Sequence, residues 1–533
     1  MVRTLLARDR AYGGVVQAPT QQQSLTSAHV LMEAPVAASS PARRLAYVGA
    51  LACCAAVALL LRLPFLNVPL TNDEGGYAYV ARLWAGGVAL YHGAWVDRPQ
   101  GLMLLFRLLV ALAPNTQGLR LFGGVYAVVN MLLLAYVGSG LYGRAVGLCA
   151  AALYAVFSSG PQIEGFIVNG ELLATLPAVA AVALVLRAQR SVRPGVYVYL
   201  AGLAAGMALL VKQSAIDGLV VVALFAPAGA RLGGRTRLRC CALALIGVAT
   251  AVLLSALHGA ATGWQEYLHA VVLDNLRYRS LDASSSGSLS QALEGVKGFW
   301  SEDAFLVVAA LGAVVHMHRT RRILDWLPLP WLAAALCGVS LGGLYSRHYF
   351  VQLLPPLCVL AAWGLVTGVQ VARRISLLGL LFIAPLAALL MTVRTDASLY
   401  VGSSPIAIAQ RLYGWTVYTH QPELVALLRR RVPTGAPFFV AYAAAPLHYL
   451  TGRPSVTRYL WRRPLGTVPG AYGDVLRKVE RAEPVCIVTV QPVAQPPGDV
   501  RMREAIARHY VLIWRRPGAA VYCRPIRSEH RAE

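Results

Sequence analysis

Eleven runs of apolar residues, each roughly long enough to cross a bilayer as a helix, constrain this chain more than any other sequence feature. Only 14% of the residues are charged and 57% are hydrophobic, which excludes an ordinary soluble protein. The sequence therefore predicts an α-helical polytopic membrane protein with about 11 transmembrane helices. The runs occupy residues 45–63, 118–140, 145–160, 171–187, 195–211, 214–230, 240–258, 304–318, 327–345, 349–371 and 376–393.

A further run, 101–114, holds Arg107 and spans only about 14 residues, so we interpret it as an interfacial or re-entrant helix. Basic residues test this choice, because they concentrate in cytoplasmic loops. With the N-terminus inside, every inner loop carries arginine: Arg144; Arg187, Arg190 and Arg193; Arg231, Arg235, Arg237 and Arg239; Arg319, Arg321 and Arg322; Arg373 and Arg374. Since the arginines of this chain (net charge +24) stand in such clusters, no nucleic-acid partner is expected.

The same threading sends most acids of the membrane region to the outer face. They are Asp73, Glu74, Asp97, Glu164, Glu171, Glu266, Asp274, Asp282, Glu294, Glu302 and Asp303. Acidic residues contribute little to membrane orientation, so their sorting is a separate indication, and it points to function at that face.

Three regions follow from this pattern. Residues 1–44 are polar and are expected to form a disordered cytoplasmic tail. Residues 45–394 form the transmembrane domain, with a long first outer loop at 64–117. Residues 395–533 lack a membrane-length run and are predicted to fold as a small extracytoplasmic α/β domain. Its expected strands are Pro437–Tyr442, Val485–Val490, Tyr510–Arg515 and Ala519–Cys523, and its expected helices are Pro422–Arg431, Asp474–Ala482 and Arg501–Arg508.

Two of the nine cysteines, Cys486 and Cys523, fall in this polar C-terminal region. If the region is extracytoplasmic, they could form a disulfide. Two free thiols buried on neighbouring strands would give the same sequence pattern. The other seven cysteines lie in or beside apolar runs, where a thiol behaves as a small hydrophobic group, and no metal-ligand spacing is found.

The first outer loop opens with two adjacent carboxylates, Asp73 and Glu74. One of them could act as a general base while the other orients it or holds a cation. The alternative is that both simply favour the first turn of a helix. Further along the loop, Arg98 precedes a proline and could bind phosphate oxygens with its guanidinium group. An arginine that extends toward lipid headgroups would look the same.

Two more cations, Lys212 and Arg347, lie on the side of the membrane that the topology rule disfavours for basic residues. Charged groups at such positions indicate a functional site, here one for an anionic ligand at the membrane surface. Each of them could equally anchor a lipid headgroup.

The motifs together resemble bacterial glycosyltransferases of family 39 in the GT-C superfamily, which include protein O-mannosyltransferases and lipid A aminoarabinose transferases. The resemblance spans roughly residues 45–460. It rests on Asp73-Glu74-x-x-Tyr77, Asp97-Arg98-Pro99, Asn169-x-Glu171, Lys212-Gln213 and the stretch Arg347-His348-Tyr349-Phe350-x-Gln352, in that order. Relatives commonly have Lys-Pro-Pro-Gly where this chain has Arg98-Pro99-Gln100-Gly101, which preserves the charge but weakens the rigid turn.

The resemblance implies a GT-C fold and the transfer of a sugar from a polyprenyl-phosphate donor to an extracytoplasmic acceptor, usually with inversion. It implies that Asp73 deprotonates the acceptor and that Glu74 orients or assists it. Binding of the donor phosphate would fall to Arg98, Lys212, Arg347 and His348. The sugar or acceptor side would be lined by Tyr77, Asp97, Asn169 and Glu171.

The expected partners are the lipid-linked donor, membrane lipids and the acceptor. The chain is expected to be a multi-pass protein of the cell membrane with its N-terminus in the cytoplasm. No cofactor is predicted; a divalent metal stays open, although the sequence does not indicate one. The alternatives are a transporter or lipid flippase, a non-catalytic subunit, and a ligase with a lipid-diphosphate donor. The long outer loop and the C-terminal domain argue against a transporter, whose polar residues would gather near the midplane.

Overall fold

The computed structural model describes residues 40–228, 233–277, 287–317, 322–341, 343–372, 394, 396–441, 444–490 and 499–525. The chain divides into two compact units, Met1–Ala50 and Leu51–Glu533, and the description below concerns the second. Most of the expected N-terminal tail and the expected crossing at 376–393 lie outside the described residues.

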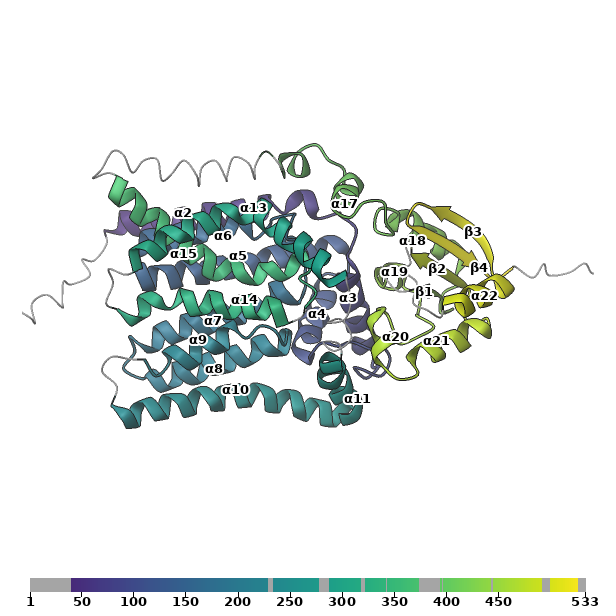
Figure 1. The fold of residues 1–533 in the computed structure, drawn as a ribbon, viewed down its shortest axis with the longest axis horizontal. Coiled ribbons are helices and arrows are strands. Elements are labelled where there is room, and N and C mark those ends of the chain that lie inside the picture. Colours follow the sequence, from purple (N-terminus) through teal and green to yellow (C-terminus); the bar gives the residue numbers. More distant parts are fainter. Residues whose placement is uncertain are drawn as a thin grey trace, which may run out of the picture. The chain divides into compact units, whose positions relative to one another are not determined.

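The membrane region consists of long apolar helices (Figure 1). They are α2 (Pro41–Leu60), α5 (Thr116–Tyr142), α6 (Arg144–Phe157), α7 (Gly170–Ala188), α8 (Pro194–Val211), α9 (Asp217–Phe225), α10 (Gly234–Thr262), α13 (Gly287–Met317), α14 (Pro328–Leu341) and α15 (Leu354–Ala372). Within the described ranges, eight helical stretches have the length and composition to cross a membrane, whereas α6 and α9 are shorter. The chain is therefore a multi-pass membrane protein, as its sequence predicts.

Shorter elements connect these helices. They are η1 (Leu63–Phe65), α3 (Asn72–Ala85), α4 (Gln100–Leu112), α11 (Trp264–Leu268), η2 (His269–Leu273), η3 (Ile323–Trp326), η4 (Arg347–Leu353) and α17 (Pro405–Tyr413). The run predicted to be interfacial is α4, a helix of 13 residues that packs against α3 and α8. Pro99 precedes it in an extended conformation and is its N-cap residue.

Two of the predicted crossings have different bounds. The helix expected at 304–318 begins at Gly287, so Glu294, Glu302 and Asp303 belong to α13 and not to an outer loop. Glu302 and Asp303 are buried, and Glu302 accepts the backbone N–H groups of Gln162 and Ile163. The helix expected at 214–230 spans only Asp217–Phe225, and Pro227, which lacks the N–H needed to continue the helical hydrogen bonds, follows its end.

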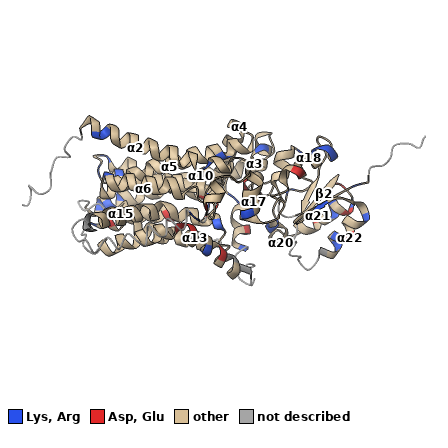
Figure 2. Cartoon of the chain, turned by 90° about the horizontal axis from the view of Figure 1, so that it is seen from above, with Lys and Arg blue, Asp and Glu red and all other residues tan. Residues whose placement is uncertain are grey.

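Basic residues stand at the connections where the sequence places the cytoplasmic side. Arg144 begins α6, Arg190 and Arg193 lie between α7 and α8, and Arg235 is near the start of α10. Figure 2 shows Lys and Arg at the end of the long helices that lies away from the sheet, near α6 and α15. This is the charge distribution that the threading requires.

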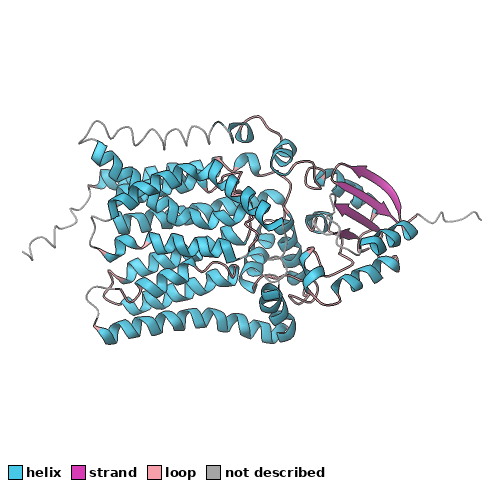
Figure 3. Ribbon diagram, viewed as in Figure 1, coloured by secondary structure: helices cyan, strands magenta, loops and turns pink. Residues whose placement is uncertain are grey.

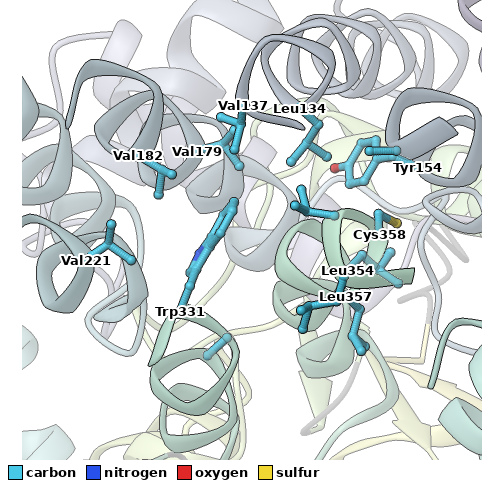
Figure 4. Packing of buried hydrophobic residues seen from close by; sticks show 14 of the residues in the cluster. Leu134, Val137, Tyr154, Val179, Val182, Val221, Trp331, Leu354, Leu357 and Cys358 are labelled. Atoms are coloured by element: carbon cyan, nitrogen blue, oxygen red, sulfur yellow. The ribbon is translucent and has the colours of Figure 1, made fainter. Parts of the chain in front are cut away.

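A group of hydrogen-bonded polar side chains lies among apolar residues in the core of the membrane region. Trp331 on α14 is fully buried and extends toward Val179 and Val182 of α7 (Figure 4). Its indole Nε1 donates to Asp217 at 2.9 Å, and Gln352 Nε2 donates to the other oxygen of the same carboxylate at 3.0 Å. These two bonds join α9, α14 and η4. Because a buried donor without an acceptor lowers stability, they favour this arrangement of the three elements.

Replacing Asp217 with Ala is expected to lower the stability of the protein by about 1–3 kcal/mol, because it leaves the N–H groups of Trp331 and Gln352 without this acceptor. Thermal unfolding of the purified protein in detergent would measure the loss. Ser340→Ala, which removes an exposed hydroxyl of α14, is the control and should leave the midpoint unchanged. A midpoint for Asp217→Ala equal to that of the control would contradict the prediction.

The C-terminal region forms the predicted α/β structure. Its elements are α18 (Gln421–Arg431), β1 (Phe439–Ala441), α19 (Pro446–Thr451), α20 (Arg463–Thr467), α21 (Ala471–Glu480), β2 (Cys486–Val490), α22 (Asp499–His509), β3 (Val511–Arg516) and β4 (Ala519–Cys523). The four strands form one sheet in the order β1-β2-β4-β3, in which β1 and β2 are parallel and the other pairs are antiparallel (Figure 3). Cys486 and Cys523 are opposite each other on β2 and β4 and are joined by a disulfide.

Helix α3 packs tightly against the C-terminal region. Hydrogen bonds join Asn72 to the backbone N–H of Ala445, and Tyr79 to that of Ser455. A Cβ atom at Gly75 would lie 2.4 Å from the Cα atom of Pro446, so only glycine allows α19 to approach this closely. The first outer loop and the C-terminal region therefore form a continuous structure, and the candidate site lies within it.

Candidate functional site

A cavity of about 1170 Å³ is lined by both the membrane region and the C-terminal region. Six of the ten predicted site residues line it: Asp73, Tyr77, Asp97, Arg98, Arg347 and His348. These six come from α3, from the loop between α3 and α4, and from η4, and η4 is far from the other two in sequence. The fold thus brings together the acidic and basic residues that the sequence assigns to one face.

Asp73 is held on the first turn of α3. Thr71 caps this helix, with its hydroxyl accepting the Glu74 N–H while the Glu74 carboxylate accepts the Thr71 N–H. Asp73 is half-buried and lines the cavity, and its Oδ1 accepts a hydrogen bond from Trp461 Nε1 at 3.1 Å. A carboxylate is favourable at this position because the N-terminal end of a helix carries partial positive charge.

Glu74 lies in a different environment from its neighbour. Its carboxylate has no exposed surface and forms an ion pair with the buried Arg120, with Nε–Oε1 and Nη2–Oε2 distances of 2.7 and 2.8 Å. It also accepts the backbone N–H of Val168 at 2.8 Å. Glu74 is not among the described residues that line the cavity. The Glu74 oxygens thus bind Arg120, Thr71 and Val168, and the part in the reaction that the resemblance implies for Glu74 stays a prediction.

Asp97 bridges two arginines on the cavity wall. Its Oδ2 lies 2.8 Å from Arg98 Nη1 and 2.6 Å from Arg463 Nη1. Burial alone would raise the pKa of Asp97, but the two guanidinium groups outweigh this and hold the pKa below its ordinary value. Asp97 is therefore a carboxylate at neutral pH, and it fixes Arg98 in place.

His348 pairs with a carboxylate that the sequence analysis did not assign to the site. Its Nδ1 lies 2.6 Å from Glu164 Oε2, and its Nε2 lies 3.8 Å from Glu171. Burial would raise the pKa of Glu164, but the hydrogen bond and charge of His348 lower it below its ordinary value. Glu164 also has a positive φ of 54°, a strained conformation of the kind found at functional sites. Next to this pair, Arg347 donates to the carbonyl of Leu412 at 3.2 Å.

Lys212, Glu171 and Asn169 are not part of the cavity lining in the described chain. Lys212 forms a buried ion pair with Glu171, and its ammonium lies 3.8 Å from the centre of the Tyr349 ring. Asn169 is the N-cap residue of α7, where its Oδ1 accepts the Leu172 N–H. Lys212 thus lies outside the described cavity lining, with its charge compensated by Glu171, and its expected binding of the donor phosphate stays a prediction.

Sequence reasoning missed the aromatic and basic residues that complete the wall. The aromatic ones are Trp95, Tyr345, Tyr349, Tyr413, Tyr418, Trp461 and Tyr472, and the basic ones are Arg462 and Arg463. The run Arg458–Arg463, in which Tyr459 and Trp461 are flanked by arginines, is a local signal that could have indicated a ligand site in the C-terminal region. Within the described residues, no group of three His, Cys, Asp or Glu is arranged to hold a metal ion.

Comparison with solved structures identifies the fold. The chain aligns with ArnT from Cupriavidus metallidurans bound to undecaprenyl phosphate at a TM-score of 0.58 and 15% identity, covering 92% of this chain and 99% of that one. It aligns with the oligosaccharyltransferase AglB from Archaeoglobus fulgidus, in complex with an inhibitory peptide and a dolichol phosphate, at a TM-score of 0.53 and 12% identity, covering 92% and 76%. The mycobacterial arabinofuranosyltransferase AftD aligns at a TM-score of 0.50 and 15% identity, covering 89% of this chain and 41% of that one.

All three are glycosyltransferases of the GT-C superfamily, so this chain has the GT-C fold that its motifs imply. At the level of sequence, no protein-family model and no curated protein matches the chain.

Proposed function

We propose that this GT-C-fold protein transfers a sugar from a polyprenyl-phosphate-linked donor to an acceptor at the extracytoplasmic face, with inversion. The observation that carries the proposal is one cavity that contains a carboxylate, Asp73, and the guanidinium groups of Arg98 and Arg347. The bound undecaprenyl phosphate and dolichol phosphate of ArnT and AglB support this class of donor.

In the proposed reaction, Asp73 takes a proton from the acceptor hydroxyl or amine as that atom attacks the anomeric carbon of the sugar. The bond from this carbon to the phosphate oxygen breaks, and its electron pair leaves with the polyprenyl phosphate. Arg98 and Arg347 bind the developing phosphate charge, and His348, held by Glu164, donates a hydrogen bond to it. Tyr77 and Asp97 lie on the sugar or acceptor side.

The orientation is part of the proposal. Arginines gather at the connections opposite the cavity, which supports a cytoplasmic location for them and an outer location for the cavity. The disulfide between Cys486 and Cys523 supports the same orientation, because disulfides persist in oxidising compartments.

The decisive experiment incubates the purified protein in lipid nanodiscs with a panel of polyprenyl-phosphate and polyprenyl-diphosphate sugars and detects the released lipid phosphate or diphosphate by mass spectrometry. We expect release with at least one donor when an acceptor extract from the cell envelope is present. A ligase would instead release lipid diphosphate from a diphosphate-linked donor, an alternative favoured by the additional Arg462 and Arg463 in the wall. If no donor of either class is consumed, the proposed transferase activity is wrong.

Arg347→Ala is expected to weaken donor binding by about tenfold, because a charge-assisted hydrogen bond to the phosphate is lost. The affinity for a non-hydrolysable analogue of a polyprenyl-phosphate sugar would be measured by microscale thermophoresis. Arg508→Ala, which removes an exposed arginine of α22, is the matched control. Equal affinity of both variants would remove Arg347 from the phosphate site.

A further inference from the structure

The C-terminal region contacts the candidate base directly. The indole Nε1 of Trp461 donates to Asp73 Oδ1 at 3.1 Å, although the two residues are separated by 388 positions in the sequence. Trp461 lines the same cavity as Asp73. Its ring also packs against Tyr77, one turn further along α3, at a centroid distance of 5.5 Å.

The first turns of α3 are shaped to admit this ring. A Cβ atom at Gly76 would lie 2.5 Å from the Cζ2 atom of Trp461, closer than van der Waals contact permits. The Asp73-Glu74-Gly75-Gly76 segment therefore combines a carboxylate with two glycines that allow the C-terminal region to reach it. A larger residue at position 76 would displace the indole, so the hydrogen bond between Trp461 and Asp73 depends on glycine at this position.

The neighbouring Arg463 gives a second, independent contact of the same kind. It binds Asp97 at 2.6 Å, and Asp97 in turn binds Arg98. The segment Trp461–Arg463 thus contacts Asp73 on α3 and Asp97 in the loop before α4. It connects the C-terminal region to the site through polar bonds as well as apolar packing.

We propose that Trp461 is a positioning residue for Asp73: its indole N–H holds the carboxylate in the orientation in which it accepts the acceptor proton. This inference rests on the proposed function and assigns a part of the reaction to the C-terminal region. Without this bond the carboxylate is no longer held toward the acceptor, and a small loss of alignment slows a chemical step strongly. The variant should therefore lose kcat while it keeps its affinity for the donor.

Trp461→Phe keeps an aromatic ring but removes the N–H donor. We expect kcat to fall roughly tenfold at neutral pH, because a hydrogen bond to a charged group is lost. Donor affinity should stay within about twofold of the wild type. Trp514→Phe is the matched control, because the Trp514 indole also donates to a carboxylate, that of Glu423, outside the cavity.

Gly76→Ala should disrupt the same hydrogen bond through a change in α3, the helix that carries Asp73. Its methyl group should displace the indole and reproduce the fall in kcat, whereas Gly473→Ala on α21, with more space around it, should not. A merely structural role of Trp461 would lower the thermal midpoint but leave kcat per folded molecule unchanged. That result, or wild-type kinetics in Trp461→Phe, would overturn the proposal.

A readout without catalysis separates this inference from the proposed function. Carbodiimides react with accessible carboxyl groups, so labelling of Asp73 at one fixed pH, followed by mass spectrometry, should be faster in Trp461→Phe, where Oδ1 has lost its hydrogen-bond donor, and unchanged in Trp514→Phe. If labelling accelerates in this way but the wild type consumes no donor, the transferase proposal fails and the positioning contact stands. If the wild type is active and labelling does not accelerate, the inference about Trp461 fails alone.

Discussion

Asp73→Asn is expected to lower kcat for sugar transfer by roughly a hundredfold to ten-thousandfold, the usual range for loss of a general base. Asparagine has nearly the same shape and can still accept the Trp461 hydrogen bond through its carbonyl oxygen, but it cannot take up the acceptor proton. The substitution should therefore remove activity without unfolding the protein. The measurement is release of polyprenyl phosphate under saturating donor, together with thermal unfolding of the same preparation.

Asp474→Asn serves as the matched control for Asp73→Asn. Asp474 lies on the first turn of α21, as Asp73 lies on the first turn of α3, but it is half-buried outside the cavity and forms ion pairs with Arg477 and Lys478 of its own helix. Its variant should retain wild-type kcat. Full activity in Asp73→Asn would assign the proton acceptor to another cavity carboxylate, with Glu164 as the next candidate.

Glu74→Ala is expected to destabilise the protein by about 3–5 kcal/mol, because it leaves the buried charge of Arg120 without its partner. Arg120 is only 2% exposed, and its remaining hydrogen bonds are to the carbonyls of Phe65 and Pro69 at 3.4 and 3.5 Å. The effect would be measured as a lower midpoint of thermal unfolding in detergent. The double variant Glu74→Ala/Arg120→Ala should recover part of the loss, since it removes the unpaired charge.

An exposed ion pair supplies the comparison for this effect. Glu504→Ala removes the partner of Arg508 on α22, and such surface pairs contribute about 0–1 kcal/mol. The Glu74 variant separates two interpretations of the Asp-Glu motif. If Glu74→Ala unfolds at the wild-type temperature but does not transfer sugar, Glu74 takes part in the reaction and its role is not structural.

The membrane architecture could be predicted from the sequence because it depends on local composition. An apolar run long enough for the bilayer must form a helix, and flanking arginines orient it. The strands of the C-terminal sheet follow from short β-branched stretches, and β4 has the predicted bounds Ala519–Cys523. The sequence also identified Asp73, Arg98 and Arg347 as cavity residues, because charged groups at the outer ends of apolar runs are costly unless they serve a purpose.

Only the tertiary structure distinguished Asp73 from Glu74, two adjacent carboxylates that are equivalent in sequence. The helical turn points one into the cavity and the other toward Arg120, 46 positions away. The tertiary structure also pairs Lys212 with Glu171 and places Trp461 next to Asp73. The hydrophobic pattern determines on which side of the membrane a charged residue lies. The role of that residue depends on which partner lies within about 3 Å of it. This distance is set by packing between segments that are far apart in the chain.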